Sequence, residues 1–215
     1  MAKSRTGETK ARILGAAAEI LRARGQDALT FDAIAARLGI TKQAVIYWFP
    51  GKADLFTELA LPGLRAEVEA VERALAAAPS RGAAARAAVR ALIEFHLADL
   101  PRFRLMYLAP QIGFSTASRV ATAEIVGQIH PVTARMYAAI AAAIDAGPAA
   151  VDGSAARETA VALHMAALGH VLLHALADAI DDPLRHPAEV LAERLATLLA
   201  AGVGGLPAAS GTPPS

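Results

Sequence analysis

The sequence predicts an all-α protein of about nine helices. Hydrophobic residues make up 55% of the 215 residues, and alanine, the strongest helix former, supplies much of that share. No segment alternates apolar and polar residues over the length of a strand, whereas apolar residues recur at helical spacing through most of the chain. Cysteine is absent, which excludes disulfides and thiolate metal sites and suits a reducing cytoplasm.

Positive charge is concentrated at the N-terminus. Residues 1–52 contain nine basic and four acidic side chains, a net charge of +5, and the remaining 163 residues therefore carry −4. A basic N-terminal segment followed by an acidic remainder indicates that only the N-terminal segment binds a polyanion.

The first helix is expected to begin between Thr6 and Thr9 and to end at Gly25, a glycine in the position that follows a helix C-terminus. Residues 1–5 precede it as a short basic arm, which we expect to be disordered or, alternatively, to touch a nucleic-acid backbone. The apolar positions of this helix repeat at 3.6 residues and predict one buried stripe. They are Ile13, Ala16, Ala17, Ile20 and Leu21.

Residues 30–49 predict two short helices joined by a tight turn. Thr30 and Thr41 are good N-cap residues for the two helices. Gly39 lies between them and is expected to take a positive φ. Helices that cross steeply must nearly touch, and Ala35 supplies the small residue that such a crossing needs. Further apolar residues would fill the wedge: Phe31, Ile34, Leu38, Ile40 and Val45.

This pattern predicts a helix-turn-helix whose second helix enters the major groove of DNA. The alternative is an ordinary corner between two helices, which the charge asymmetry disfavours. Gln43 could pair with adenine and Ala44 could touch a thymine methyl group, while Thr41 and Lys42 would hold phosphates. The predicted DNA contacts are Thr30, Thr41, Lys42, Gln43, Ala44, Tyr47, Trp48 and Lys52.

The segment TKQAVIYWFPGKADLF, preceded by ILGAAAEILRARGQDALTFDAIAARLGI, resembles the DNA-binding domain of TetR-family transcriptional regulators. The resemblance covers about residues 9–56. It rests on a glycine and a threonine in the first connection and on an aromatic-Pro-x-Lys-x-acidic-Leu run. These residues are Gly25, Thr30, Phe49, Pro50, Lys52, Asp54 and Leu55.

Two positions depart from the pattern of that family. Ile46 stands where the family usually has Tyr, and Trp48 where it usually has His. The resemblance implies that Tyr47 takes over the role of the missing tyrosine. It also implies that Trp48 either donates its indole N–H to a phosphate or packs inward.

The body of the chain predicts further helices, with breaks at prolines and glycines. They run from about Gly51 to Ala78 with a break or kink at Pro62-Gly63, Arg81 to Leu100, Arg102 to Ile112, Arg119 to Ala146 with a kink at Pro131, Ser154 to Ile180, and Pro187 to Ala201. We expect a DNA-binding domain over residues 1–52, an effector-binding and dimerisation domain over residues 53–201, and a disordered tail over residues 202–215.

Residues 159–177 contain no Asp, Glu, Lys or Arg, and their number approaches that of a membrane-spanning helix. Three histidines and the lack of flanking aromatic or basic belts predict instead a helix buried in protein on most sides. A membrane-associated protein is the alternative, which recovery in the soluble fraction would exclude.

This helix and the last one are apolar on more than one face, so they predict a homodimer, as the resemblance also implies. A central helix in a monomeric bundle is the alternative. The residues expected at the dimer contact are Leu168, Leu172, Leu176, Leu191, Leu195 and Leu198.

An effector pocket is expected among the body helices, with an apolar lining that suits a hydrophobic or aromatic ligand. For each candidate, core packing or surface exposure is the alternative. The candidates are Phe95, His96, Phe103, Met106, Tyr107, Gln111, Phe114, His130, Met136, Tyr137 and His164.

No cofactor, metal or catalytic site is expected. His170 and His174 are spaced for a metal but have no evident further ligand apart from His164 two turns back, and no nucleophile elbow, phosphate loop or HExxH helix is present. The sequence therefore predicts a ligand-responsive transcriptional regulator, expected to be a repressor that binds a palindromic operator as a homodimer and is released by a hydrophobic effector. The alternative is a sequence-tolerant, architectural DNA-binding protein without an effector.

Overall fold

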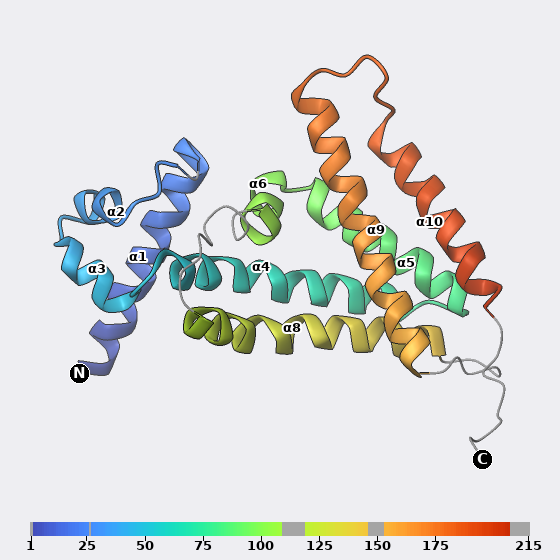
Figure 1. Ribbon diagram of the computed structural model, residues 1–215, viewed down its shortest axis with the longest axis horizontal. Coiled ribbons are helices and arrows are strands. Elements are labelled where there is room, and N and C mark those ends of the chain that lie inside the picture. Colours follow the sequence, from blue (N-terminus) through green and yellow to red (C-terminus); the bar gives the residue numbers. More distant parts are fainter. Residues whose placement is uncertain (1, 26, 109–118, 146–152, 207–215) are drawn as a thin grey trace. The chain divides into compact units, whose positions relative to one another are not determined.

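The structure is a computed structural model that describes residues 2–25, 27–108, 119–145 and 153–206. Over these ranges it contains nine α-helices, one π-helix and no strand, which confirms the all-α prediction (Figure 1). The helices are α1 (Ala2–Arg24), α2 (Phe31–Leu38), α3 (Lys42–Trp48), α4 (Lys52–Leu75), α5 (Arg81–Leu97), α6 (Leu100–Phe103), the π-helix η1 (Arg104–Leu108), α8 (Arg119–Asp145), α9 (Gly153–Ala179) and α10 (Ala188–Gly204).

The chain folds into two compact units. The first unit comprises Met1–Gly63 and Pro101–Ile129, and the second comprises Leu64–Leu100 and His130–Ser215. Two helices belong to both units: α4 passes from one to the other after Gly63, and α8 does so after Ile129.

The first unit is built on an apolar core shared by α1, α2, α3 and the start of α4. The predicted stripe of α1 and the predicted inner face of α2 both contribute to it, and α1 begins at Ala2, earlier than the sequence indicated. The buried members are Ile13, Ala16, Ala17, Ile20, Leu29, Ile34, Ala35, Val45, Phe49, Leu55 and Phe56.

Local hydrogen bonds define both ends of α2 and the start of α3. The hydroxyl of Thr30 accepts from the Ala33 N–H at 3.0 Å, and that of Thr41 accepts from the Ala44 N–H at 3.1 Å. Gly39 has φ = 64°, and the following Ile40 N–H donates to the Ala35 carbonyl at 3.1 Å. The predicted caps and the predicted left-handed glycine are therefore confirmed.

The first unit also contains a segment that the sequence described incorrectly. A single helix was expected from Arg102 to Ile112, but α6 ends at Phe103 and continues as the π-helix η1; residues 109–112 lie outside the described residues. In a π-helix each backbone hydrogen bond spans five residues instead of the four of an α-helix. The spacing of apolar residues in the sequence does not reveal this difference. Gly63 lies beside η1, because a Cβ there would stand 2.7 Å from the Met106 Sδ.

In the second unit α5 packs against both α9 and α10 (Figure 1). The contacts use alanines, which let helix axes approach closely. At Gly82 a Cβ would stand 3.0 Å from the carbonyl oxygen of Ala200 on α10. The buried alanines are Ala84, Ala85 and Ala88 on α5, Ala160 and Ala167 on α9, and Ala192 and Ala196 on α10.

Several helix ends differ from the expected ones. α4 continues through Pro62 and ends at Leu75, because buried residues on both sides of the proline hold the helix together as one element. Pro187 is the N-cap of α10 rather than its first residue, and α10 extends to Gly204, into the expected tail.

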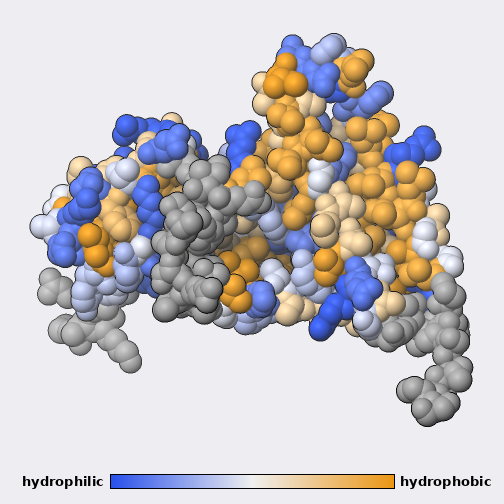
Figure 2. Space-filling model, in the orientation of Figure 1, coloured by the Kyte–Doolittle hydropathy of each residue, from blue (hydrophilic) through white to orange (hydrophobic). Residues whose placement is uncertain are grey.

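Helix α9 exposes more apolar surface than the sequence predicted. Ser154–Ala179 is long and apolar enough to span a membrane by length and composition, with a mean hydropathy of 1.7, and 28% of its most apolar stretch is buried. The expectation of burial on most sides is therefore not met within one chain. Figure 2 shows the resulting apolar surface over α9 and α10.

The turn before α3 requires a positive φ at Gly39, and this requirement can be tested by substitution. Gly39→Ala places a Cβ at φ = 64° and should lower the free energy of unfolding by about 1 kcal/mol. Gly15→Ala, at an exposed helical site with no neighbour within 4 Å, should instead raise it by up to about 1 kcal/mol. Urea unfolding followed by the fluorescence of Trp48, the single tryptophan, measures both. Equal effects of the two variants would contradict the assignment.

Candidate nucleic-acid interface and the buried polar quartet

Helix α3 presents a polar and aromatic surface. Thr41, Lys42 and Gln43 are exposed at its start, and Tyr47 is 78% exposed one turn further on. Val45 is fully buried beneath them and anchors the helix to the core. The first unit thus exposes Thr41, Lys42, Gln43 and Tyr47, four of the predicted DNA contacts, at the start of α3 and along it.

The two departures from the family pattern lie on the flank of this surface. Ile46 and Trp48 are both half-buried, and Trp48 packs against the core of the first unit. The ring of Trp48 meets the ring of Tyr47 edge-on, with centroids 5.3 Å apart. Trp48 therefore contacts both the core of the first unit and the exposed ring of Tyr47.

Two of the predicted phosphate contacts have acidic neighbours. The Lys42 ammonium lies 2.8 Å from the Asp32 carboxylate of α2, and both groups are largely exposed. At the start of α4, beside Lys52, the Asp54 carboxylate accepts from the Gly51 N–H at 2.8 Å. Asp54 thus already occupies one of the backbone N–H donors at the start of α4.

The second unit contains four buried or half-buried polar side chains in contact, which we call the polar quartet: Glu67 of α4, His96 of α5, Tyr137 of α8 and His164 of α9. The Glu67 Oε1 lies 3.0 Å from the His96 Nε2 and 3.3 Å from the His164 Nε2. The Tyr137 hydroxyl lies 2.8 Å from the His164 Nδ1.

The geometry assigns the protons of the quartet. A carboxylate only accepts, so the Nε2 of each imidazole donates to Glu67. A neutral His164 then has its lone pair on Nδ1, and the Tyr137 hydroxyl donates to it. One chain of hydrogen bonds therefore ties together four helices of the second unit.

The quartet keeps Glu67 ionised. Burial alone would raise the pKa of this carboxyl, but hydrogen bonds from His164 and His96, and the charge that either imidazole can carry, lower the pKa from 4.5 to about 2. Burial and the negative charge of Glu67 raise the pKa of Tyr137, so its hydroxyl keeps its proton.

The predicted effector residues are distributed over both units. The second unit brings together His96, Tyr137 and His164, sets Phe95 against His96 with ring centroids 5.1 Å apart, and buries Met136. His130 of the same unit is exposed on the surface of α8, because it sits on the solvent-facing side of that helix.

The remaining candidates lie elsewhere. Phe103 and Met106 are buried in the first unit, and the ring of Tyr107 contacts that of Phe103 at 5.7 Å. Gln111 and Phe114 fall outside the described residues.

Sequence reasoning missed Glu67. The signal was present, because Glu67 is spaced three residues from Leu64 and four from Val71, which places it on the buried stripe of α4. A lone carboxylate at such a position needs a partner, and two of the predicted histidines are those partners.

The histidine pair of α9 does not form part of a metal site in the described part of the chain, where no group of three His, Cys, Asp or Glu side chains has the required arrangement. The rings of His170 and His174 are parallel, with centroids 6.4 Å apart. Burial and the neighbouring His174 lower the pKa of His170, which favours the neutral form of the His170 imidazole.

The quartet predicts an acid-dependent loss of stability. Since the pKa of Glu67 is depressed, its contribution is present above pH 4.5 and is lost as the pH falls toward about 2. Glu67→Gln should lower the free energy of unfolding at pH 7 by on the order of 3 kcal/mol. Urea unfolding followed by circular dichroism tests this, with the exposed Glu69→Gln as the control. A gap between wild type and Glu67→Gln that persists unchanged down to pH 2 would refute the assignment.

Comparison with known proteins places this architecture. Residues 13–59 match the family model described as bacterial regulatory proteins of the tetR family. No curated protein matches the chain.

Solved structures share the fold over nearly the whole chain. A tetR-family regulatory protein from Rhodococcus RHA1 superposes with a TM-score of 0.61 at 20% identity, covering 91% of this chain and 96% of its own. A TetR/AcrR-family regulator from Thermobifida fusca gives a TM-score of 0.57 at 23% identity, with 91% and 98% coverage. FadR from Bacillus subtilis, solved with stearoyl-CoA, gives a TM-score of 0.63 at 14% identity, with 89% and 97% coverage.

Residues 13–59 thus match the DNA-binding domain of the tetR family, and the chain shares the fold of solved TetR-family regulators over about nine tenths of its length.

Proposed function

We propose that this protein is a repressor that binds a palindromic operator as a homodimer and releases it when a small hydrophobic effector binds. The observation that carries the proposal is the exposed surface of α3 on a capped helix-turn-helix. The experiment that tests it is selection of bound duplexes from a random pool, repeated with hydrophobic candidate effectors. Enrichment of a palindrome supports the proposal, and binding without any enriched sequence would favour an architectural protein instead.

In the proposed complex some residues of α3 and its neighbours contact bases, and others contact phosphates. Gln43, exposed in the first turn, pairs with a base edge, and Ala44 meets a thymine methyl group. Thr41, Lys42 and Lys52 contact phosphates and set the register. Lys42 exchanges its ion pair with Asp32 for a phosphate, which is inexpensive because both groups are exposed.

The proposed dimer uses the apolar faces of α9 and α10, the region that Figure 2 shows as an apolar surface. Leu176 is 55% exposed and Leu198 is 64% exposed, whereas a monomer would cover such side chains. Pairing two copies about a two-fold axis buries these faces and places two recognition helices on symmetric half-sites. The other leucines of the proposed contact are Leu168, Leu172, Leu191 and Leu195.

The proposed effector acts through the second unit. The polar quartet offers hydrogen-bonding groups among buried apolar side chains, the composition of a small-molecule site. Glu67 lies on α4, which is continuous from Lys52 in the first unit to Leu75 in the second. An effector shifts the equilibrium only through unequal affinity for the two states. FadR of Bacillus subtilis was solved with stearoyl-CoA, which makes a long-chain acyl compound a natural first probe.

Two variants separate base reading from phosphate binding. Gln43→Ala should change the enriched sequence more than the total affinity, because the side chain reads a base. Lys52→Ala should weaken binding to all sequences and flatten the salt dependence, because it contacts phosphate. Selection from the random pool and titration over salt concentration measure the two effects. If Gln43→Ala leaves the enriched sequence unchanged, the assignment of base reading is wrong.

The proposed dimer contact has its own test. Leu176→Glu should convert the dimer to a monomer and reduce operator affinity at least tenfold, since a charge replaces an apolar contact at each copy. Val126→Glu, at another exposed apolar site, on α8, should leave the dimer intact. Sedimentation equilibrium measures the mass, and a Leu176→Glu protein that stays dimeric would exclude this face.

A further inference from the structure

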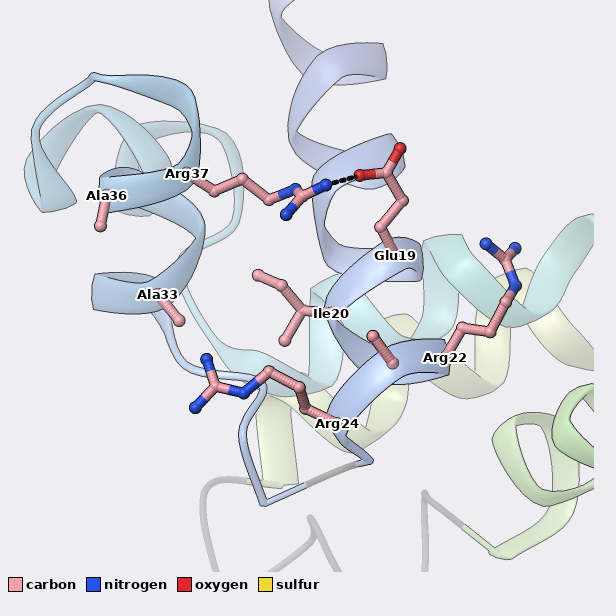
Figure 3. Close-up of a pocket in the computed structure, with 8 residues that line it drawn as sticks. Glu19, Ile20, Arg22, Arg24, Ala33, Ala36 and Arg37 are labelled. Carbon is pink, nitrogen blue, oxygen red and sulfur yellow. Dashed lines mark hydrogen bonds and ion pairs between the residues drawn. The ribbon is translucent and has the colours of Figure 1, made fainter.

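A cleft of about 510 Å³ lies between α1 and α2 in the first unit (Figure 3). No predicted DNA contact and no member of the polar quartet lines it. Its apolar lining consists of Ile20 and Ala23 of α1 and Ala33 and Ala36 of α2. Because the alanine side chains are too short to fill the space between the two helices, a cleft remains that is large enough for a small organic molecule.

The charged side chains at the cleft are mainly positive. Arg22, Arg24 and Arg37 line it together with the carboxylate of Glu19. The Arg37 guanidinium pairs with Glu19, and these two charges compensate each other. The other two arginines give the cleft a net positive charge, which favours an anion over a neutral or cationic ligand.

The charges are distributed unevenly around the apolar lining. In Figure 3 the Arg37–Glu19 pair connects α2 to α1 on one side of Ile20, and Arg24 extends toward α2 on the other side. Within the described ranges of the chain no hydrogen bond or ion pair engages Arg24, which is exposed. The N-terminal end of α2, whose partial positive charge also attracts anions, borders the cleft at Ala33. One end of the cleft therefore suits an anionic group, and its middle suits an apolar one.

We propose that the cleft binds an amphipathic monocarboxylate, whose apolar part lies on Ile20 and the alanines and whose carboxylate pairs with Arg24. A guanidinium binds a carboxylate through two parallel hydrogen bonds. A second anionic group has no use here, because the charges at the other end of the cleft are already compensated. The bound molecule contacts both α1 and α2 and therefore stabilises their packing. This site is separate from the effector binding proposed for the second unit, and it does not depend on the proposed DNA binding.

The test follows the δ1 methyl resonance of Ile20 by nuclear magnetic resonance while the full-length protein is titrated with octanoate. Ile20→Val identifies the resonance. We expect a saturable shift with octanoate and a much weaker response to 1-octanol and octylammonium, which carry the same alkyl chain without the negative charge. The methyl resonances of Ile140 and Ile144, buried in the second unit, report separately on any binding there.

Two pairs of variants separate the charge of the cleft from its shape. Arg24→Gln should weaken octanoate binding by about fivefold, as expected for the loss of one exposed ion pair. Arg12→Gln, at an exposed arginine of α1 that does not line the cleft, should leave the affinity near that of wild type. Ala36→Phe should fill the cleft and abolish the shift, whereas Ala11→Phe, at an exposed alanine of α1 outside the cleft, should preserve it.

Each outcome decides the proposal. The absence of a saturable shift at Ile20 would overturn it, and so would equal responses to octanoate and 1-octanol or equal effects of Arg24→Gln and Arg12→Gln. A shift confined to the second unit would also overturn it, because the ligand would then bind elsewhere. Circular dichroism checks that the variants fold. If Ala36→Phe does not fold, the ligand series and the two arginine variants, both at exposed positions, still decide the question.

Discussion

The second unit depends on one buried carboxylate. Glu67 lies on a helix face that is otherwise apolar, and an isolated charge in such a place would destabilise the fold by several kcal/mol. Two imidazoles from α5 and α9 donate to it, and Tyr137 of α8 completes the chain of hydrogen bonds. The four helices must therefore hold these groups within hydrogen-bond distance, and any shift of α4 in this unit must either carry the quartet along or break it.

Alanine determines how the helices around this centre pack. Because α5 meets α9 and α10 through alanines and a glycine, the helix axes approach closely and little side-chain volume is left between them. Several leucines of α9 and α10 are nevertheless exposed, among them Leu172, Leu176 and Leu198, on the two helices over which Figure 2 shows an apolar surface. The exposed leucines of α9 contribute to the composition that makes this helix resemble a membrane span.

In the first unit, ion pairs redistribute the charge that the sequence displays. The net charge of residues 1–52 identifies a basic head, but it does not distinguish a lysine paired with a neighbouring carboxylate from an arginine that is free. Lys42 of α3 is paired with Asp32, whereas no ion pair engages Arg24 among the residues that the structure describes. Exposed pairs of this kind are weak, so each of these cations can exchange its carboxylate partner for another anion at little cost.

The sequence by itself determined the helix-turn-helix, because its signals are local. The caps Thr30 and Thr41, the left-handed Gly39 and the inner face of α2 all act within a few residues, and the structure has each of them. Only the tertiary structure decided what depends on partners distant in the chain. Glu67 meets His96 from 29 residues away, His130 proves to be exposed, and the expected helix after Pro101 becomes a π-helix beside Gly63. The spacing of apolar residues reports which side of a helix is buried, but not which polar group of another helix will lie opposite it.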